Sequence, residues 1–438
     1  MSVRAWVFRE FELIPSKRQL TREGVSLHLQ PKTYQVLVEL VKHAGEVVSR
    51  ESLQSSVWAG TYVGDANLTN SIAALRKALA PDAIETVSKT GYRFAWEVND
   101  RPGVSQAAEA LLREGKELMA RRTTESVAAA QNVFCQAIAE EPWYAEAWAW
   151  LARASRYLEK YHVSREQNRK LAEAAFRRAF LQNPDLPSAH QFYTTYQSDR
   201  GDALGAMKRL LERVARFPED ANSYAGLVQV CRFNGLLEES VDANDRALQI
   251  APDVSTSVAH THFALGDYRE VIESYAIEGR RARGYLDAAA WACVGDPAWV
   301  AQEISARLAA PAFPPLFTAL LQSLLCALQN DARGALEVIS AQDLSDDPES
   351  ALYFSRHLAR CGCRDAALQL LGQSIDGGLY IPAMLDADPW FGSLQKDAAF
   401  HMLNRRAAER HAEARAEFER CGGRRVVPAR KVATRRPD

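Results

Sequence analysis

The chain has 438 residues, which is too long for one compact core and predicts roughly two to four folding units. Hydrophobic residues make up 47% and charged residues 25% of the sequence, which is typical of folded proteins and excludes a mostly disordered or collagen-like chain. The formal net charge of -2 gives no whole-chain electrostatic reason to expect a nucleic-acid partner.

The seven cysteines are scattered and odd in number, a usage typical of reduced thiols in the cytoplasm, and we expect no disulfide framework. The start, MSVRAWVFREFEL, lacks the apolar run of a signal peptide, and no window of about eighteen uninterrupted apolar residues occurs. These features predict a cytoplasmic protein that is neither exported nor inserted in a membrane.

The first elements predicted in chain order are short strands. Apolar and aromatic residues alternate with polar ones over residues 6–29, with turn residues at Pro15 and Gly24, which predicts a small antiparallel sheet. Pro31 then favours the start of a helix that Gly45 ends. Ser49 is a suitable N-cap for a short second helix through Trp58, and a loop follows over residues 59–65.

The third helix carries the strongest signal in this region. Leu68, Ile72, Leu75 and Leu79 fall at i, i+4, i+7 and i+11, which places them on one buried stripe. The opposite face is therefore expected to be exposed to solvent. Asn70 and Lys77 point directly away from the stripe. Their neighbours on this face are Asn67, Ala73 and Ala74, and Arg76 lies at its edge. Two strand-like segments, 84–87 and 92–96, then enclose Ser88-Lys89-Thr90-Gly91, which predicts a hairpin with a basic tip.

Strands, three helices and a hairpin in this order resemble the winged-helix DNA-binding domain of OmpR-type response regulators. The segment NLTNSIAALRKAL, residues 67–79, is similar to the recognition helix of that family, and TVSKTGYRF, residues 86–94, is similar to its wing. The resemblance covers about the first hundred residues. Because two spaced motifs match in the right order, it is more specific than a lone short pattern.

The resemblance implies a set of DNA-contacting residues. Asn67 and Asn70 fit base reading in the major groove, because amide groups discriminate bases there. Lys77, Arg76 and Arg50 would neutralise phosphates, and Lys89 and Arg93 on the wing could reach the backbone or the minor groove. The full expected DNA-binding set is Arg50, Asn67, Asn70, Ser71, Ala74, Arg76, Lys77, Thr86, Ser88, Lys89, Tyr92 and Arg93.

Two features make this interface sparse. Ala73 and Ala74 stand where relatives often carry polar or basic contact residues, and residues 1–100 contain 12 Lys and Arg residues against 11 Asp and Glu residues. We therefore expect weak binding by one domain, offset by several copies on tandem half-sites. The alternative is an amphipathic helix that is merely solvated on its polar side.

From about residue 106 the sequence becomes rich in alanine and repeats itself. Turn-forming prolines recur at Pro142, Pro184, Pro218 and Pro252, and Gly201 and Gly235 each lie midway between two successive prolines. Helix pairs with a period of about 34 residues resemble tetratricopeptide repeats. The interval from Pro142 to Pro184 is longer than the two that follow it, which predicts an insertion, placed at residues 161–167.

Beyond Pro252 the period loosens, although Gly266, Gly295, Asn330 and Gly362 keep turn-like spacings. The fold class is thus multidomain, an α+β winged helix-turn-helix followed by an all-α tetratricopeptide-like solenoid. The expected divisions are a winged helix over 1–100, a linker over 101–107, repeats over 108–278, degenerate repeats over 279–418 and a basic disordered tail over 419–438. Unrelated helices are the alternative for 280–415.

No motif of an enzyme or a metal site is found, including phosphate-binding loops, zinc-protease helices and nucleophile elbows. Cys361 and Cys363 have a spacing that fits neither a zinc site nor a redox pair, and His260 and His262 lack a third ligand at helical spacing. We expect no catalytic activity, cofactor or metal.

A winged helix joined directly to helical repeats resembles HilA-like regulators and, more loosely, the actinobacterial antibiotic-regulatory proteins. This sequence likewise has no room for a receiver domain before Trp6. The resemblance implies a sequence-specific transcriptional regulator, with an activator favoured over a repressor. Expected partners are double-stranded promoter DNA, RNA polymerase, and a protein or second copy bound through the repeats. The alternative is a cytosolic repeat scaffold whose winged helix no longer binds DNA.

Overall fold

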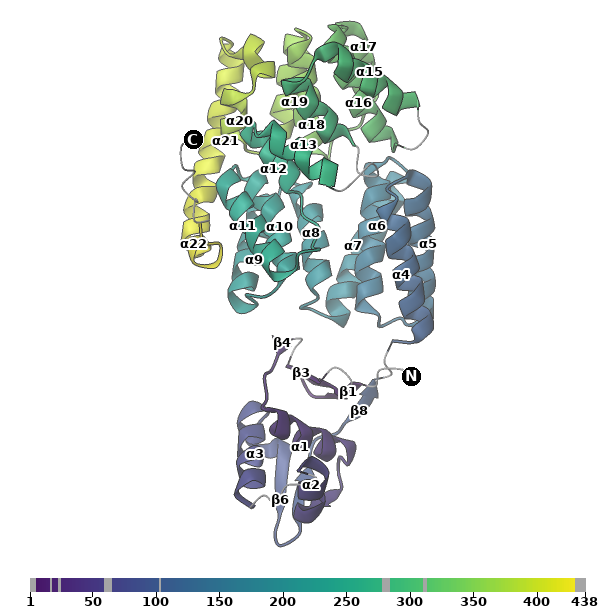
Figure 1. Cartoon of the computed structure of the whole chain (residues 1–438), viewed down its shortest axis with the longest axis vertical. Helices are drawn as coiled ribbons and strands as arrows, with labels where there is room; N and C mark the ends of the chain where they lie inside the picture. The colour runs from purple at the N-terminus through teal and green to yellow at the C-terminus, as the bar shows by residue number, and fades with distance from the viewer. Residues whose placement is uncertain are drawn as a thin grey trace. The chain divides into compact units, whose positions relative to one another are not determined.

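The computed structural model describes residues 5–15, 18–22, 25–58, 65–101, 104–277, 284–309 and 313–429. An α+β domain occupies the described residues up to Arg101, and the elements from Gln106 to Val426 are all helices (Figure 1). Internal contacts divide the chain into two compact units. The first comprises Met1–Glu114, Val133–Ala147 and Arg178–Leu186, and the second comprises Gly115–Asn132, Trp148–Arg177 and Pro187–Asp438. No helix in the described ranges is long and apolar enough to span a bilayer.

The predicted N-terminal sheet is confirmed. Its strands are β1 (Ala5–Phe8), β2 (Phe11–Ile14), β3 (Gln19–Arg22), β4 (Val25–Ser26) and β8 (Asn99–Arg101), in the antiparallel order β4-β3-β2-β1-β8. Phe8, Phe11 and Leu13 are buried, and Trp96 lies in ring contact with both phenylalanines. These side chains join the sheet to the helices, because the same hydrophobic core includes Leu37, Leu75 and Phe94.

The three helices and the wing lie where the sequence places them. They are α1 (Pro31–Lys42), α2 (Arg50–Val57), α3 (Asp65–Ala78), a 3-10 turn η2 (Pro81–Ala83), β5 (Val47–Ser49), β6 (Ile84–Val87) and β7 (Gly91–Phe94). The Ser49 hydroxyl accepts a hydrogen bond from the Ser52 amide at 3.0 Å, which confirms the predicted N-cap of α2. The predicted loop lies at 59–64, outside the described residues, apart from Asp65, which begins α3.

Two strands of this domain were not predicted. β8 pairs with β1 and completes the first sheet, so the sheet extends into the start of the predicted linker. β5 pairs with β7, which gives the wing sheet the order β5-β7-β6. Both strands are too short to display the alternation of apolar and polar side chains by which a strand is recognised in sequence.

The remainder is helical, as predicted. The helices are α4 (Gln106–Ala120), α5 (Thr124–Glu140), α6 (Ala145–Lys160), α7 (Arg165–Gln182), α8 (Pro187–Ser198), α9 (Ala203–Arg216), α10 (Ala221–Phe233), α11 (Leu237–Ile250), α12 (Val258–Leu265), α13 (Tyr268–Ile277), α14 (Tyr285–Val294), α15 (Pro297–Ala309), α16 (Pro315–Gln329), α17 (Ala332–Ser340), α18 (Pro348–Arg360), α19 (Arg364–Asp376), α20 (Pro382–Ala387), η4 (Pro389–Leu394), α21 (Ala398–Arg420) and α22 (Gly423–Val426).

The packing of these helices is that of a repeat array. Alternate helices contact one another in succession, from α8 to α10, α12, α14, α16 and α18, and each also contacts the helix that follows it. Gly201 and Gly235 have φ values of 79° and 72° in the turns that precede α9 and α11, a backbone region that favours glycine. The regular pairing continues through the region where the sequence period loosens, so the tetratricopeptide-like architecture extends to α18–α19.

The predicted insertion at residues 161–167 is wrong. The turn between α6 and α7 has the same length as the turn between α8 and α9. Instead α6 has 16 residues against 12 in α8, and α7 has 18 against 14 in α9. The extra length between Pro142 and Pro184 therefore adds about one helical turn to each of α6 and α7.

The predicted disordered tail is also wrong for residues 419–429. Helix α21 continues to Arg420, α22 follows, and Val427 is fully buried in a core that includes Phe418 and Val228. Arg424 forms ion pairs with the carboxylates of Asp242, at 2.7 Å, and of the buried Glu239. One of the basic residues that suggested a solvated tail, Arg424, is thus matched by acidic residues of α11. Residues 430–438 lie outside the described residues.

Candidate nucleic-acid interface

Helix α3 is held in place by its apolar stripe. Leu68, Ile72, Leu75 and Leu79 are all buried, and α3 contacts α1, α2 and β6. The periodicity of this stripe thus fixes which face of the helix is turned to solvent.

The exposed face of α3 is narrow and lacks bulky side chains. Its exposed residues are Ala66, Asn67, Thr69, Asn70, Ala73, Ala74 and Lys77. Of the expected contact residues, Asn67, Asn70, Ala74 and Lys77 therefore lie together on one accessible surface. Small side chains with amides among them suit a helix that must enter a groove and bond to base edges.

Thr69 is an exposed residue of this face that the expected DNA-binding set omits. It lies about 100 degrees from Leu68 around the helix, as does Asn67 on the other side, so the periodicity contains the signal needed to include it. Ser71, which the expected set includes, is buried, and its hydroxyl donates to the carbonyl of Asn67 at 2.9 Å. The structure therefore places Thr69, not Ser71, on the accessible side.

Arg76 ties α3 to the wing. Its Nε and Nη2 atoms donate to the carbonyl of Ile84 at 3.0 and 2.7 Å, and Nη2 also donates to the Thr86 hydroxyl at 2.8 Å. The Ile84 carbonyl thus accepts two charge-assisted hydrogen bonds from one guanidinium. This arrangement fixes the angle between the third helix and β6, a role that sequence reasoning, which assigned Arg76 to phosphates, did not foresee.

The wing is a tight hairpin whose tip is exposed. β6 and β7 pair from Ile84 opposite Phe94 to Val87 opposite Gly91, and Ser88, Lys89 and Thr90 are exposed between them. A Cβ atom added at Gly91 would lie 2.0 Å from the carbonyl oxygen of Val48, because β5 passes directly beside it. Glycine is therefore required where the wing sheet closes, and Lys89 takes up the left-handed turn with φ of 60°.

The other expected wing residues have partners inside the domain. Tyr92 is buried, and the guanidinium carbon of Arg50 lies 5.1 Å from the centre of its ring. Arg93 forms an ion pair with Glu85 at 2.5 Å on the neighbouring strand. Tyr92 thus differs from the expectation of a DNA contact, since its ring belongs to the core and supports Arg50 through a cation–π contact.

The region that carries this geometry is similar to known transcriptional regulators. The family model described as "Transcriptional regulatory protein, C terminal" matches residues 24–94. The transcriptional activator CadC of Escherichia coli (strain K12) is 39% identical over 91 residues, which cover 19% of this chain and 18% of CadC. The transcriptional regulator HilA of Salmonella typhimurium is 38% identical over 98 residues, which cover 22% of this chain and 18% of HilA.

A solved structure matches the same region. The Klebsiella pneumoniae RstA DNA-binding domain, in complex with the RstA box, is 31% identical, with a TM-score of 0.20, and the match covers 21% of this chain and 96% of that domain. The N-terminal domain of this chain belongs to the OmpR-type family of transcriptional regulators. The chain spans 18% of the length of the two curated relatives, so what it shares with them is the OmpR-type domain.

The OmpR-type domain leaves several cations exposed, and two of them lie on α3 and at the tip of the wing. Arg9, Arg22 and Arg93 are paired with carboxylates at 2.9, 3.2 and 2.5 Å. Lys77 and Lys89 are exposed and have no carboxylate within ion-pair distance in the described part of the chain. The near-neutral domain therefore still presents accessible positive charges beside the candidate interface, one on the exposed face of α3 and one at the wing tip, in addition to exposed cations elsewhere in the domain.

The cysteines and histidines of the helical region do not form a metal centre in the part of the chain that is described, where no cluster of three His, Cys, Asp or Glu residues is suited to a metal ion. His260 instead bonds the Tyr353 hydroxyl at 2.8 Å, and His262 lies 3.6 Å from Asp267. All seven cysteines are free thiols.

Proposed function

We propose that this chain binds double-stranded DNA sequence-specifically and regulates transcription. Helix α3 enters the major groove, where Asn67 and Asn70 read base edges and Ala74 permits close approach. The observation that carries this proposal is the exposed, small and amide-bearing face of α3, held beside an exposed basic wing tip by Arg76.

Phosphate contacts come from the cations that the domain leaves accessible. Lys77 and Lys89 approach the backbone directly, and Arg50, oriented by Tyr92, reaches it from the start of α2. Ser88, Thr86 and Thr69 add hydroxyl donors at the edges of this surface. Arg76 and Arg93 act mainly by shaping the wing, since both guanidinium groups are bonded within it.

The near-neutral charge of the domain supports binding as several copies on tandem half-sites, because few phosphate contacts give one domain little affinity. The helical array supplies the surface for self-association or for a protein partner, and RNA polymerase is the partner that activation would require. The array works by recognition and not by catalysis, and the whole protein acts in the cytoplasm as an activator.

Mapping of the genomic sites bound by the full chain tests this proposal. The map should contain repeated half-sites at a fixed spacing upstream of genes, and Asn70→Ala should relax the sequence preference at one position, at a cost of about 1 to 3 kcal/mol. Asn99→Ala, an exposed change on β8 in the other sheet, is the matched control. A folded protein that enriches no sequence would support the protein-interaction scaffold instead.

A further inference from the structure

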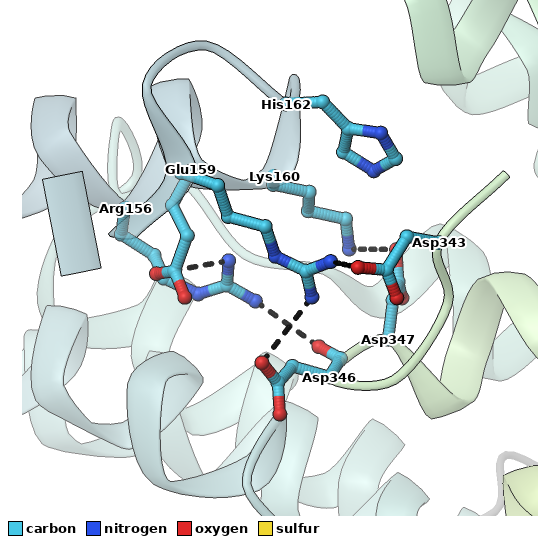
Figure 2. A pocket seen from close by; sticks show the side chains of 8 residues that line it. Arg156, Glu159, Lys160, His162, Asp343, Asp346 and Asp347 are labelled. Carbon is cyan, nitrogen blue, oxygen red and sulfur yellow. Dashed lines mark hydrogen bonds and ion pairs between the residues drawn. The ribbon is translucent and has the colours of Figure 1, made fainter. Parts of the chain in front are cut away.

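Two segments far apart in the sequence meet through charged side chains in the second compact unit. One is the extended end of α6 and the start of α7, and the other is the connection between α17 and α18, residues 341–347 (Figure 2). Four cations of the first segment, Arg156, Lys160, Arg165 and Arg169, face three aspartates of the second. Arg165 and Asp343 are 178 residues apart in the sequence, so this contact joins early and late repeats of the array.

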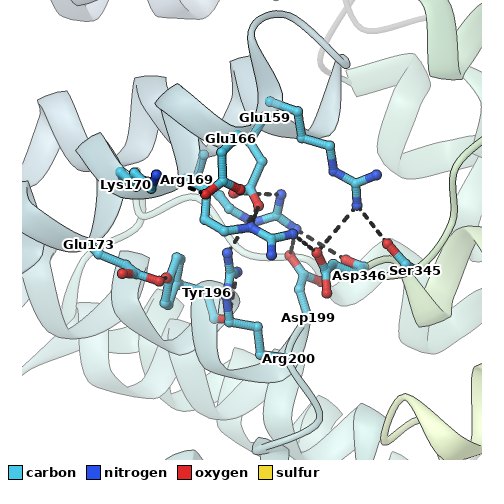
Figure 3. A network of polar contacts seen from close by, with 12 residues as sticks. Glu159, Glu166, Arg169, Lys170, Glu173, Tyr196, Asp199, Arg200, Ser345 and Asp346 are labelled. Carbon is cyan, nitrogen blue, oxygen red and sulfur yellow. Dashed lines mark hydrogen bonds and ion pairs between the residues drawn. The ribbon is translucent and has the colours of Figure 1, made fainter.

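Arg165 makes more contacts across this junction than any other residue. It forms ion pairs with Asp343 and, at 3.3 Å, with Asp346, and it donates to the Ser345 hydroxyl at 3.0 Å. Arg169 pairs with Asp346, and Lys160 pairs with Asp347 at 3.0 Å. Figure 2 shows the side chain of Lys160, and Figure 3 that of Arg169, directed toward the connection. We call Lys160, Arg165, Arg169 and residues 343–347 the ionic junction.

The lengthened helices explain why the junction exists. Glu159 and Lys160 end α6, and Arg165 begins α7, so they occupy the part of the pair that the extra helical turns extend. On the other side, Leu344 is buried in the main core and anchors the connection while the aspartates on both sides of it reach the cations. A ring contact of Tyr161 with Phe317, with centroids 6.3 Å apart, accompanies the ion pairs.

Several charged groups in and beside the junction keep a partner on their own side. Arg169 also bonds Glu159 at 3.1 Å, and Arg156 bonds Asp199 at 2.5 Å (Figure 3). On the opposite side, Asp347 accepts from the Ser350 amide at 3.1 Å and caps α18. Separation of the two sides would leave Arg169 and Arg156 ion-paired and Asp347 hydrogen-bonded by Ser350, which limits the cost of an isolated buried charge.

Apart from Asp347, which is 8% exposed and keeps its hydrogen bonds from Ser350, the groups that would lose their ion-pair partners are the more accessible ones. The side chains of Lys160, Arg165 and Asp346 are 23%, 22% and 24% exposed, whereas those of Arg156 and Asp199 are 8% and 4% exposed. Partly exposed ion pairs are individually weak and are screened by salt. A cavity of about 10 Å³, room for roughly one water molecule, lies among these residues and offers water a first point of entry.

We propose that the ionic junction is a reversible latch, which closes the array between α6–α7 and the α17–α18 connection and opens when its exposed ion pairs are screened or displaced. Opening frees the extended tip of α6–α7 and the aspartates of the connection, while the networks on each side stay intact. The latch is independent of DNA recognition by α3, so it can be tested without any DNA.

Hydrogen exchange of the full chain at low and high salt tests the latch. Peptides covering residues 161–169 and 341–347 should exchange roughly tenfold faster at about 0.5 M salt than at about 0.05 M, while peptides from the cores of α10 and α18 should not change. Equal rates at both salt concentrations in the two junction segments would overturn the proposal. This measurement uses the unaltered protein, so it does not depend on the folding of a variant.

Charge exchange provides the second test. Arg165→Glu or Asp343→Arg alone should give fast exchange of both segments even at low salt, and the double variant should restore slow exchange. Arg333→Glu, with or without Glu337→Arg, is the matched control, because that pair is exposed and lies within α17. If the single reversals leave the junction closed, or if the double variant is no slower than the singles, the junction is not a latch.

Discussion

Replacement of Arg76 by Gln tests whether this residue is part of the architecture of the winged helix or mainly a phosphate contact. In the structure its guanidinium donates two hydrogen bonds to the Ile84 carbonyl and one to the Thr86 hydroxyl. Glutamine keeps a polar side chain but is too short to reach both groups from the same turn of α3, so the contact between α3 and β6 should loosen.

The size of the effect follows from the bonds that are lost. A hydrogen bond that involves a charged group contributes about 1.5 to 3 kcal/mol. Water has little access to the Ile84 carbonyl, because the whole residue is only 1% exposed. Since the two bonds to Ile84 share one acceptor, they count as little more than one. We expect Arg76→Gln to lower the free energy of unfolding of the domain by about 2 kcal/mol, within the range for one such bond.

The assay is hydrogen exchange of the full chain, followed on peptides from α3, β6 and β7, because it reports on this domain separately from the array. Exchange in these peptides should become roughly 30-fold faster, the factor that corresponds to about 2 kcal/mol. Lys77→Gln is the control, since Lys77 is the exposed neighbour on the same helix and should leave exchange unchanged while weakening DNA binding.

Unchanged exchange of β6 in Arg76→Gln, together with a loss of DNA affinity as large as that of Lys77→Gln, would contradict this role of Arg76. Arg76 would then act mainly as a phosphate contact, as the sequence alone indicates, and the bonds to Ile84 would contribute nothing measurable to the fold.

Three further predictions concern packing, protonation and charge. Gly91→Ala should destabilise the winged helix by about 3 kcal/mol or more, seen as accelerated exchange of β5 and β7, because its Cβ would overlap the Val48 carbonyl; unchanged exchange would disprove the close approach. Burial, together with the nearby positive charge of Arg356, holds the pKa of His357 well below its ordinary value. Below about pH 6.5 the imidazole is therefore protonated in the unfolded chain but not in the folded protein. Stability should therefore fall by up to about 1.4 kcal/mol per pH unit below that point, and urea unfolding of His357→Gln should lack this contribution; identical pH profiles would argue against a neutral buried histidine. Lys89→Gln should weaken binding to specific and random duplexes equally, and it should reduce the slope of log binding constant against log salt concentration by about 0.9. A loss confined to the specific site would instead make Lys89 a base reader.

The parts of the fold that depend on local or regularly spaced sequence patterns could be predicted from the sequence. The stripe of Leu68, Ile72, Leu75 and Leu79 determines the orientation of α3, and the regularly spaced prolines and glycines mark the helix pairs. These signals are local, since one buried face or one left-handed turn needs only its own neighbours in the chain.

The features that escaped prediction depend on partners far along the chain. The sequence around Arg76 does not show whether its guanidinium faces a phosphate or the Ile84 carbonyl. Only the folded wing brings the Ile84 carbonyl within hydrogen-bond distance of it. Arg424 likewise has the appearance of a solvated tail residue until Glu239 and Asp242 are brought beside it. The lengthening of α6 and α7 also escaped, because an interval between prolines records how many residues are added but not whether they are helical.

The most direct test of the central claim is binding of the full chain to its own upstream DNA, measured across a salt series beside a random duplex. We predict preferential binding to a discrete site, and we expect Asn70→Ala to abolish this preference. If Arg50, Lys77 and Lys89 each neutralise one phosphate, log binding constant should fall with log salt concentration at a slope of about -3 for each bound domain. Absent or salt-independent binding by the folded protein, or equal affinity for both duplexes, would contradict DNA recognition by α3.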